Sequence, residues 1–176
     1  MLLLGSLPAL KKEAVVKKLR LATVTALSTL AVGAGMIFPS SAQAATYWTF
    51  QNGRFGTCLT AGDNDSAYAT ICQGWQRQQW DWVGSGHGSY HQLKNRVTGK
   101  CLMTDNNTNT NAVWMSDCRD AAGQWWFYDT PSESLFNQIG AAGESFLRTS
   151  DVRDAVYSTD LGQVDPSYYD WSGSTS

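Results

Sequence analysis

Histidine is scarce in this chain, and the common metal-binding patterns of cysteine are missing. The 176 residues contain only two histidines, His87 and His91, and no two of the four cysteines form a C-x-x-C pair. Zinc sites are built from closely spaced Cys and His residues, so we expect no metal and no cofactor. Neither histidine belongs to a recognisable nucleophile motif, and a general base needs a positioned partner, so we expect no enzymatic activity.

Positive charge is also in short supply once the start of the chain is set aside. Residues 11–20 carry a basic cluster, residues 21–38 are apolar, and a stretch of small residues ends at Ala44. This order is typical of a secretory signal peptide over residues 1–44, although an apolar run of that length also comes close to a membrane anchor. We expect cleavage after Ala44 and a secreted, extracellular protein with no membrane span.

The charge balance of residues 45–176 bears on the class of partner. This part has eight Lys and Arg against 14 Asp and Glu, a net charge of −6, and it holds all eight tryptophans. A phosphate backbone is repelled by such a surface, so nucleic acid is not expected as a partner. Aromatic side chains on this scale serve protein cores and sugar-binding surfaces alike.

Helical periodicity is missing as well. No stretch of residues 45–176 places apolar residues 3.6 positions apart, whereas short segments with strand-like alternation lie between polar turns. The sequence therefore predicts one all-β domain of about twelve short strands. In the middle of the chain the expected strands are residues 91–96, 101–104, 112–115 and 124–128.

What the chain does have is an internal repeat, over approximately residues 45–88, 89–131 and 132–176. Each repeat carries a Cys-Leu or Phe-Leu pair, then a second Cys or a Leu, and an aromatic residue eight positions after that. A fixed period of this kind predicts one structural unit per repeat. The markers are Cys58, Cys72 and Trp80 in the first repeat, Cys101, Cys118 and Trp126 in the second, and Phe146, Leu161 and Tyr169 in the third.

The repeats also suggest how the cysteines pair. An oxidising compartment favours disulfides, and four cysteines allow three connectivities. Because the two pairs occupy equivalent places, we predict that each closes within its own repeat, stabilising the fold by about 3 kcal/mol per bond. An apolar contact between Phe146 and Leu161 is expected in the third repeat. The predicted disulfides are Cys58 with Cys72 and Cys101 with Cys118.

Repeats that combine Cys-Leu, a second Cys and a Q-x-W sequence resemble the ricin-type (ricin B-like) β-trefoil lectin domains, here of the secreted, single-domain, bacterial kind. The Q-x-W sequence is QQW at 78–80 and QWW at 124–126, and it is degenerate around Tyr169. The resemblance implies a pseudo-threefold β-trefoil over residues 45–176, with a six-stranded barrel capped by three hairpins. It also implies that the Q-x-W residues are structural core, namely Gln78, Trp80, Gln124, Trp126 and Tyr169.

The residues with which this family ordinarily binds sugar are replaced here. The resemblance implies an acid two residues after the first Cys and a stacking aromatic two residues before the second. Their replacement argues against ordinary galactose-type binding. The acid places hold Thr60, Met103 and Arg148, and the aromatic places hold Thr70, Ser116 and Thr159.

A substitute aromatic recurs two positions before each replaced stacking residue, next to a polar turn. A flat ring packs on the C–H face of a sugar while carboxylates and amides bind its hydroxyls. Rim packing and the backbone needs of turns are alternative explanations. We predict that the second repeat holds the best site. The candidates there are Trp114, Asp105, Asn106, Asn109 and Ser116, with Tyr68 and Asp63 in the first repeat and Tyr157 and Asp151 in the third.

Two functions follow from these residues. The first is a secreted, non-enzymatic, carbohydrate-binding domain that recognises a glycan or polysaccharide through exposed aromatics and polar turns. The second is a protein-binding trefoil, an inhibitor or a targeting subunit of a secreted assembly, which the replaced sugar-binding residues favour. An interface of that kind needs only aromatic anchors within a polar rim.

Overall fold

The computed structural model describes residues 46–139 and 144–176, so the predicted signal peptide over residues 1–44 lies outside the described residues. The described part is all-β, with three short 3₁₀ turns and no helix of the length and apolarity that a membrane crossing requires. The strands are β1 (Trp48–Asn52), β2 (Thr57–Ala61), β3 (Ala67–Ile71), β4 (Trp80–His87), β5 (Tyr90–Asn95), β6 (Cys101–Thr104), β7 (Asn111–Ser116), β8 (Trp125–Asp129), β9 (Ser134–Asn137), β10 (Ser145–Thr149), β11 (Val156–Thr159) and β12 (Trp171–Thr175).

Six of these strands form a barrel. β1 pairs with both β4 and β12, β4 pairs with β5, β5 with β8, and β8 with β9, all antiparallel. The ring closes where β9 meets β12, because the backbone N–H of Trp171 donates to the carbonyl of Glu133 at 2.6 Å. The last strand of the chain therefore joins the first strand to the rest of the barrel.

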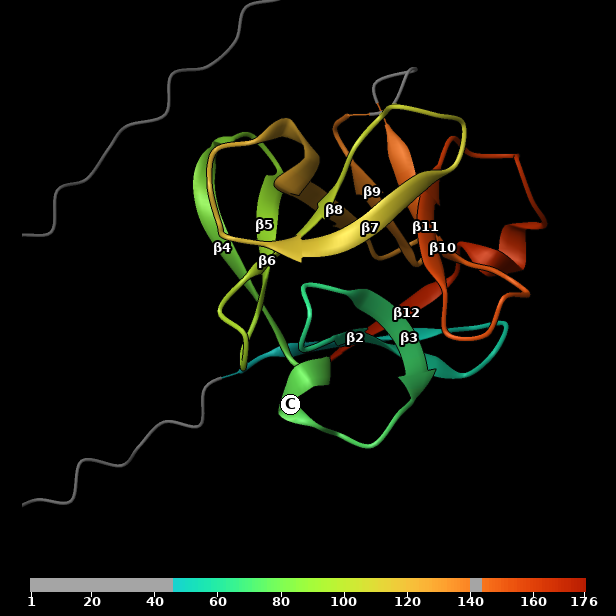
Figure 1. The fold of residues 1–176 in the computed structure, drawn as a ribbon, viewed down its shortest axis with the longest axis horizontal. Helices are drawn as coiled ribbons and strands as arrows, with labels where there is room; N and C mark the ends of the chain where they lie inside the picture. The colour runs from blue at the N-terminus through green and yellow to red at the C-terminus, as the bar shows by residue number, and fades with distance from the viewer. Residues whose placement is uncertain (1–45, 140–143) are drawn as a thin grey trace, which may run out of the picture. The chain divides into compact units, whose positions relative to one another are not determined.

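The other six strands form three hairpins, β2–β3, β6–β7 and β10–β11. The hairpins also contact one another, because β7 pairs with β11 and single bridges join Ser66 to Trp114 and Tyr68 to Ala155. Figure 1 shows the three hairpins gathered around a common centre. Each repeat thus supplies two barrel strands and one hairpin, which is the predicted pseudo-threefold arrangement.

The core is built from the same residue types in each repeat. Three tryptophans are fully buried, and the indole N–H of each donates to the carbonyl of a buried leucine at 2.9–3.2 Å. Large aromatic side chains bury the most apolar area, and the hydrogen bond satisfies their one polar atom. The pairs are Trp80 with Leu59, Trp126 with Leu102, and Trp171 with Leu147.

The third repeat corrects the predicted position of the Q-x-W tryptophan. Trp171, rather than Tyr169, takes the place of Trp80 and Trp126, because this repeat has two more residues before its last strand. Tyr169 is buried as predicted, but its hydroxyl bonds Thr159 Oγ1 and the carbonyl of Asp160. Tyr169 therefore makes the hydrogen bonds that the motif glutamine makes in the other repeats. In the second repeat, Gln124 Nε2 donates to Ser116 Oγ and to the carbonyl of Asp117.

Both predicted disulfides are present, Cys58–Cys72 and Cys101–Cys118, each with Cα atoms 5.0 Å apart. The third repeat has no such bond and is closed by rings instead. Phe146 packs against Phe136 and Tyr169, with ring centroids 5.3 Å and 6.1 Å apart. Leu161, which we expected to contact Phe146, is 61% exposed. An aromatic cluster around Phe146 therefore takes the place of the disulfide, and the expected contact with Leu161 is not part of it.

A buried asparagine ends the first strand of every repeat, a feature that our reading of the sequence missed. Asn95 Nδ2 donates to the carbonyls of Arg77 and Gln79, while its Oδ1 accepts from the backbone N–H groups of Val97 and Thr98. These bonds fix the turn that leads into the hairpin. The equivalents of Asn95 are Asn52 and Asn137, and all three are fully buried.

Candidate functional site

The three predicted aromatics lie at equivalent places on β3, β7 and β11, and all three are half-buried. On β7 the neighbours Val113 and Met115 are buried, so the predicted alternation of faces is present. The backbones of Trp114 and Tyr68 also form the bridges between hairpins described above. Each ring lies opposite the place of the missing family acid: Tyr68 opposite Thr60, Trp114 opposite Met103, and Tyr157 opposite Arg148.

Arg148 puts a positive charge where the ricin-type lectins that the chain resembles have an acid. The side chain is only 6% exposed, and its guanidinium carbon lies 5.1 Å from the centre of the Tyr157 ring. Nε donates to Thr159 Oγ1 and Nη1 donates to the carbonyl of Thr149. A guanidinium only donates hydrogen bonds, so this residue cannot replace the acceptor that a family acid offers to sugar hydroxyls.

The polar turn of the first repeat is held by ion pairs. Asp63 binds Arg77, and Asp65 accepts from Lys100 Nζ at 2.5 Å. The hydrogen bond with Asp65 raises the pKa of Lys100. Asp63, a predicted ligand-binding residue, would have to share its carboxylate between Arg77 and a sugar hydroxyl.

The second-repeat candidates are dispersed over the turn and the strand behind it. Asn106 and Asn109 are exposed, while Asp105 Oδ2 accepts from Asn107 Nδ2 at 2.5 Å. Ser116 Oγ accepts from Gln124 Nε2, which ties this hydroxyl to the Q-x-W residues. The turn is therefore accessible, but Ser116 serves the fold.

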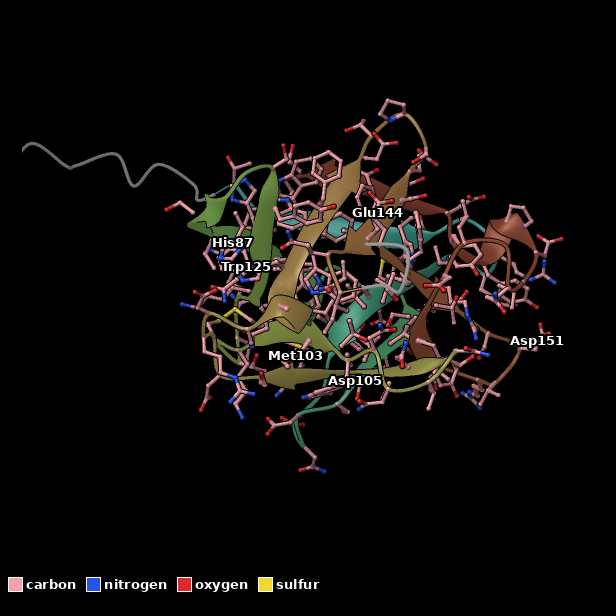
Figure 2. The ribbon with its side chains drawn as sticks, turned by 90° about the horizontal axis from the view of Figure 1, so that it is seen from above. His87, Met103, Asp105, Trp125, Glu144 and Asp151 are labelled. Atoms are coloured by element: carbon pink, nitrogen blue, oxygen red, sulfur yellow. A yellow bond between two sulfur atoms is a disulfide. The ribbon has the colours of Figure 1, made fainter. Side chains whose placement is uncertain are left out.

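The third-repeat turn borders a hollow of about 320 Å³, which we call the inter-repeat hollow. Residues 149–155 line one side, and Phe55, Thr57 and Ala69 of the first repeat line the other. The turn is anchored by Asp154, whose backbone has a φ of 61° and whose carbonyl accepts from the Ala69 N–H. Asp151 also lines this hollow, and Figure 2 shows it well apart from Asp105.

Further polar groups surround Asp151. A hydrogen bond with Asp151 is the main cause that raises the pKa of Tyr168. The Arg54 guanidinium lies 4.1 Å from the centre of the Tyr168 ring and 3.7 Å from the Asp165 carboxylate. Beside them, the Phe55 ring is 45% exposed. An acid, a phenol and an exposed ring thus come together at one place on the surface.

A second hollow, of about 490 Å³, lies at the barrel mouth and was not predicted. β1 runs from Trp48 toward the hairpin that follows Asn52, so its Trp48 end lies away from the hairpins. The available signal was the alternation of Trp80 with Trp82 and of Trp126 with Tyr128, which puts two aromatics on the inner face of each strand. The lining residues are Trp48, Trp82, Ser89, His91, Trp126, Phe127, Tyr128 and Thr130.

His87 is held by a hydrogen bond and by a ring. Its imidazole stacks on Trp125 with centroids 3.8 Å apart, and its Nε2 lies 3.0 Å from Asp120 Oδ1. Figure 2 labels His87 and Trp125 next to each other. The same carboxylate oxygen accepts from Trp125 Nε1. This cluster attaches the β4–β5 hairpin to the start of β8.

No protein-family model and no curated protein matches the chain. Solved structures do match, among them the designed threefold symmetric protein ThreeFoil, with a TM-score of 0.60 and 18% identity over 72% of this chain and 96% of that one. The fold is a β-trefoil. The twelve strands and three hairpins of the described residues are those of this architecture.

Two natural proteins also match in structure. The Vibrio vulnificus hemolysin/cytolysin β-trefoil lectin, solved with N-acetyl-D-lactosamine bound, has a TM-score of 0.56 and 19% identity over 75% of this chain and 96% of that one. An endo-β-galactosidase from Clostridium perfringens has a TM-score of 0.60 and 13% identity over 74% of this chain, which covers 32% of the enzyme. Identities this low establish the fold, and the chemistry must come from this chain's own residues.

Proposed function

We propose that this trefoil is an exported, non-enzymatic domain that binds a glycan at the inter-repeat hollow. One observation carries the proposal. Asp151 and Asp154 reach a hollow that is also lined by the exposed ring of Phe55. Carboxylates that accept hydroxyl hydrogen bonds beside an aromatic face are the two elements that sugar recognition needs.

The geometry suggests how a sugar would bind. The C–H face of a pyranose packs on Phe55 while Asp151 and Asp154 accept hydrogen bonds from its hydroxyls, and Thr57 and Ser150 offer further hydroxyl partners. The anchored backbone of Asp154 holds the turn in place, so little conformational entropy is lost on binding. One shallow site of this kind binds weakly, and a polymer that reaches further sites raises the apparent affinity.

The proposal is tested with insoluble polysaccharides and a glycan array, using free sugar as competitor. We expect binding that free sugar displaces and that Asp151→Ala weakens about tenfold or more, because a charge-assisted hydrogen bond is worth about 1.5–3 kcal/mol. Asp117→Ala, which removes an exposed carboxylate of the second repeat, is the matched control and should bind as the unaltered protein does. A folded protein that binds no glycan would reject the function.

The second repeat stays a competing location for the site. If its turn binds the sugar, Trp114→Ala should abolish binding and Asp151→Ala should leave it unchanged. The two variants therefore separate the prediction made from the sequence from the one that the hollow supports. Circular dichroism and the thermal midpoint of each variant show whether the fold is intact.

The replaced family residues favour the alternative, a protein-binding trefoil of a secreted assembly. Buried Arg148 stands at a place where an acid was expected, and Arg77 pairs with the carboxylate of Asp63. On this alternative the exposed aromatics anchor a partner protein instead of a sugar. Capture of one defined protein from the secreted fraction, undisturbed by free sugars and lost in Trp114→Ala, would favour it.

A further inference from the structure

The barrel mouth contains an aromatic hollow that the proposed site does not use. We propose that this hollow is a second, separate subsite that takes one neutral hexose ring of the glycan. The inference rests on the proposed glycan-binding function. It concerns the opposite end of the barrel from the hairpins, where the sequence suggested no site.

The hollow exists because the three repeats differ at one place. Two residues after each buried tryptophan of the core, the chain has Trp82, Tyr128 and Gly173. Tyr128 lies against Gly173, where an added Cβ would come within 2.8 Å of its ring, and its hydroxyl oxygen accepts from the Gly173 N–H at 2.8 Å. The Tyr128 side chain thus packs on β12, and the hollow lies between it and the strands β4 and β5.

The walls are held in position by the core beneath them. Fully buried Phe50 contacts Trp48, Trp82 and Tyr128, with ring centroids 5.3–6.0 Å apart. Trp48 also meets Tyr128 edge to face at 5.7 Å. These rings are half-buried, so each keeps an accessible part that faces the hollow. Rings fixed in this way lose little freedom when a sugar packs on them.

The polar groups at the rim fit hydroxyls. His91 Nδ1 lies 3.1 Å from the carbonyl of Gly84. A carbonyl only accepts, so Nδ1 carries the hydrogen, and Nε2 is the ring atom left to bond a sugar hydroxyl. Nε2 has no hydrogen-bond partner within residues 46–139 and 144–176. Ser89 and Thr130 add two hydroxyls to the same lining.

The charge around the hollow selects a neutral ligand. None of the lining residues is a Lys, Arg, Asp or Glu. Burial raises the pKa of Tyr128, the hydrogen bond from the Gly173 N–H lowers it in part, and the nearby carboxylates of Glu133 and Asp129 raise it. A sugar acid would meet these carboxylates, and no lysine or arginine lines the hollow to pair with it. A hollow of this size lies within the usual range for small ligands, and aromatic walls with a few polar groups are their usual lining.

The test uses ¹⁹F spectra of protein labelled with 5-fluorotryptophan, with each signal assigned by a Trp→Phe variant. The probes are glucose, galactose, mannose and N-acetylglucosamine, with glucuronic and galacturonic acid as charged counterparts. We expect the Trp48 and Trp82 signals to move with at least one neutral sugar. The sugar acids should bind about tenfold more weakly or worse.

Two variants test the walls of the hollow in different ways, so that unfolding of one variant would still leave the other as a test. Trp82→Ala should weaken neutral-sugar binding at least about tenfold. Gly173→Ala should do the same by displacing Tyr128 into the hollow, while leaving every lining side chain in the sequence. Trp75→Ala is the control, since Trp75 is 45% exposed and does not line the hollow.

Each outcome decides the inference. Movement of the Trp48 and Trp82 signals, abolished by Gly173→Ala and kept in Asp151→Ala, supports a separate subsite. Sugar binding that leaves both signals in place and is lost in Asp151→Ala overturns the subsite but keeps the proposed function. Absence of any sugar binding by folded protein overturns both. Binding of sugar acids as tight as that of neutral sugars overturns the selectivity.

Discussion

Single residues in this molecule combine packing with one specific hydrogen bond. Trp80, Trp126 and Trp171 fill the barrel, and each also satisfies a buried leucine carbonyl. Tyr169 spans the distance that the motif glutamine covers elsewhere, since its hydroxyl reaches Thr159 and Asp160. A tyrosine and a glutamine can therefore occupy equivalent positions in two repeats, because each hydrogen-bonds the corresponding hydroxyl and carbonyl groups.

Replacing Trp171 tests its role as the third core tryptophan. Trp171→Phe removes ring volume from a fully buried place and leaves the carbonyl of Leu147 without its donor. We expect the free energy of unfolding to fall by about 2–4 kcal/mol, measured by urea denaturation. Trp75→Phe, at an exposed place, should change it by less than about 0.5 kcal/mol. Equal effects of the two variants would contradict the assignment.

At the scale of elements, short turns position the strands. The 3₁₀ turn Pro166–Tyr168 precedes β12, and Asp165 caps it by accepting from the backbone N–H and the hydroxyl of Ser167. Proline at the start of the turn lacks an N–H that would otherwise need a partner. The turn also places Tyr168 beside Arg54 and the inter-repeat hollow.

The cap makes part of the stability depend on pH. The hydrogen bonds from Ser167 hold the pKa of Asp165 below its ordinary value of 3.8. The ionised carboxylate therefore stabilises the fold above pH 3.8, and this contribution is lost as the pH falls through the lowered pKa. Asp165→Ala should lower the thermal midpoint near neutral pH and have little effect well below pH 3.8. A difference from the unaltered protein that stays constant with pH would contradict this.

At the scale of the whole molecule, the first and last strands of the described residues complete the barrel. β12 pairs with β1 from Trp48 opposite Thr175 to Asn52 opposite Trp171. The N–H and carbonyl of Tyr47 also bond Ser176. Contacts this distant in sequence slow folding, because a long loop must be closed before they form.

Shortening the chain tests this closure. A chain that ends after Asp170 loses β12 and the core residue Trp171, so β1 and β9 both lose a neighbouring strand. We expect such a chain to be unfolded at room temperature, as judged by amide proton dispersion in nuclear magnetic resonance spectra. A chain that ends after Thr175 should fold, because it loses only the backbone bonds of Ser176 with Tyr47. If the chain that ends after Asp170 folds, closure of the barrel by β12 is not required for folding.

Much of the architecture follows from the sequence alone. The repeat period, the alternation of the short segments and the equivalent cysteines predicted an all-β fold of three units with Cys58–Cys72 and Cys101–Cys118 bonded. These features lie within a single repeat and recur in the others, so several independent positions support the same prediction. The resemblance to ricin-type lectins implied that Trp80 and Trp126 are core residues, and both are fully buried.

Only the tertiary structure decided where the hollows lie. The inter-repeat hollow joins Phe55 to Asp151, and the mouth hollow depends on the absence of a side chain at Gly173, far along the chain from Tyr128. The third repeat has two extra residues before its last strand, so Trp171, and not Tyr169, is equivalent to Trp80 and Trp126. This became clear only from the hydrogen bond that the Trp171 indole donates to the Leu147 carbonyl. Repetition in the sequence determines what the three units share, whereas a site arises where they differ, and that depends on which side chains the closed barrel brings together.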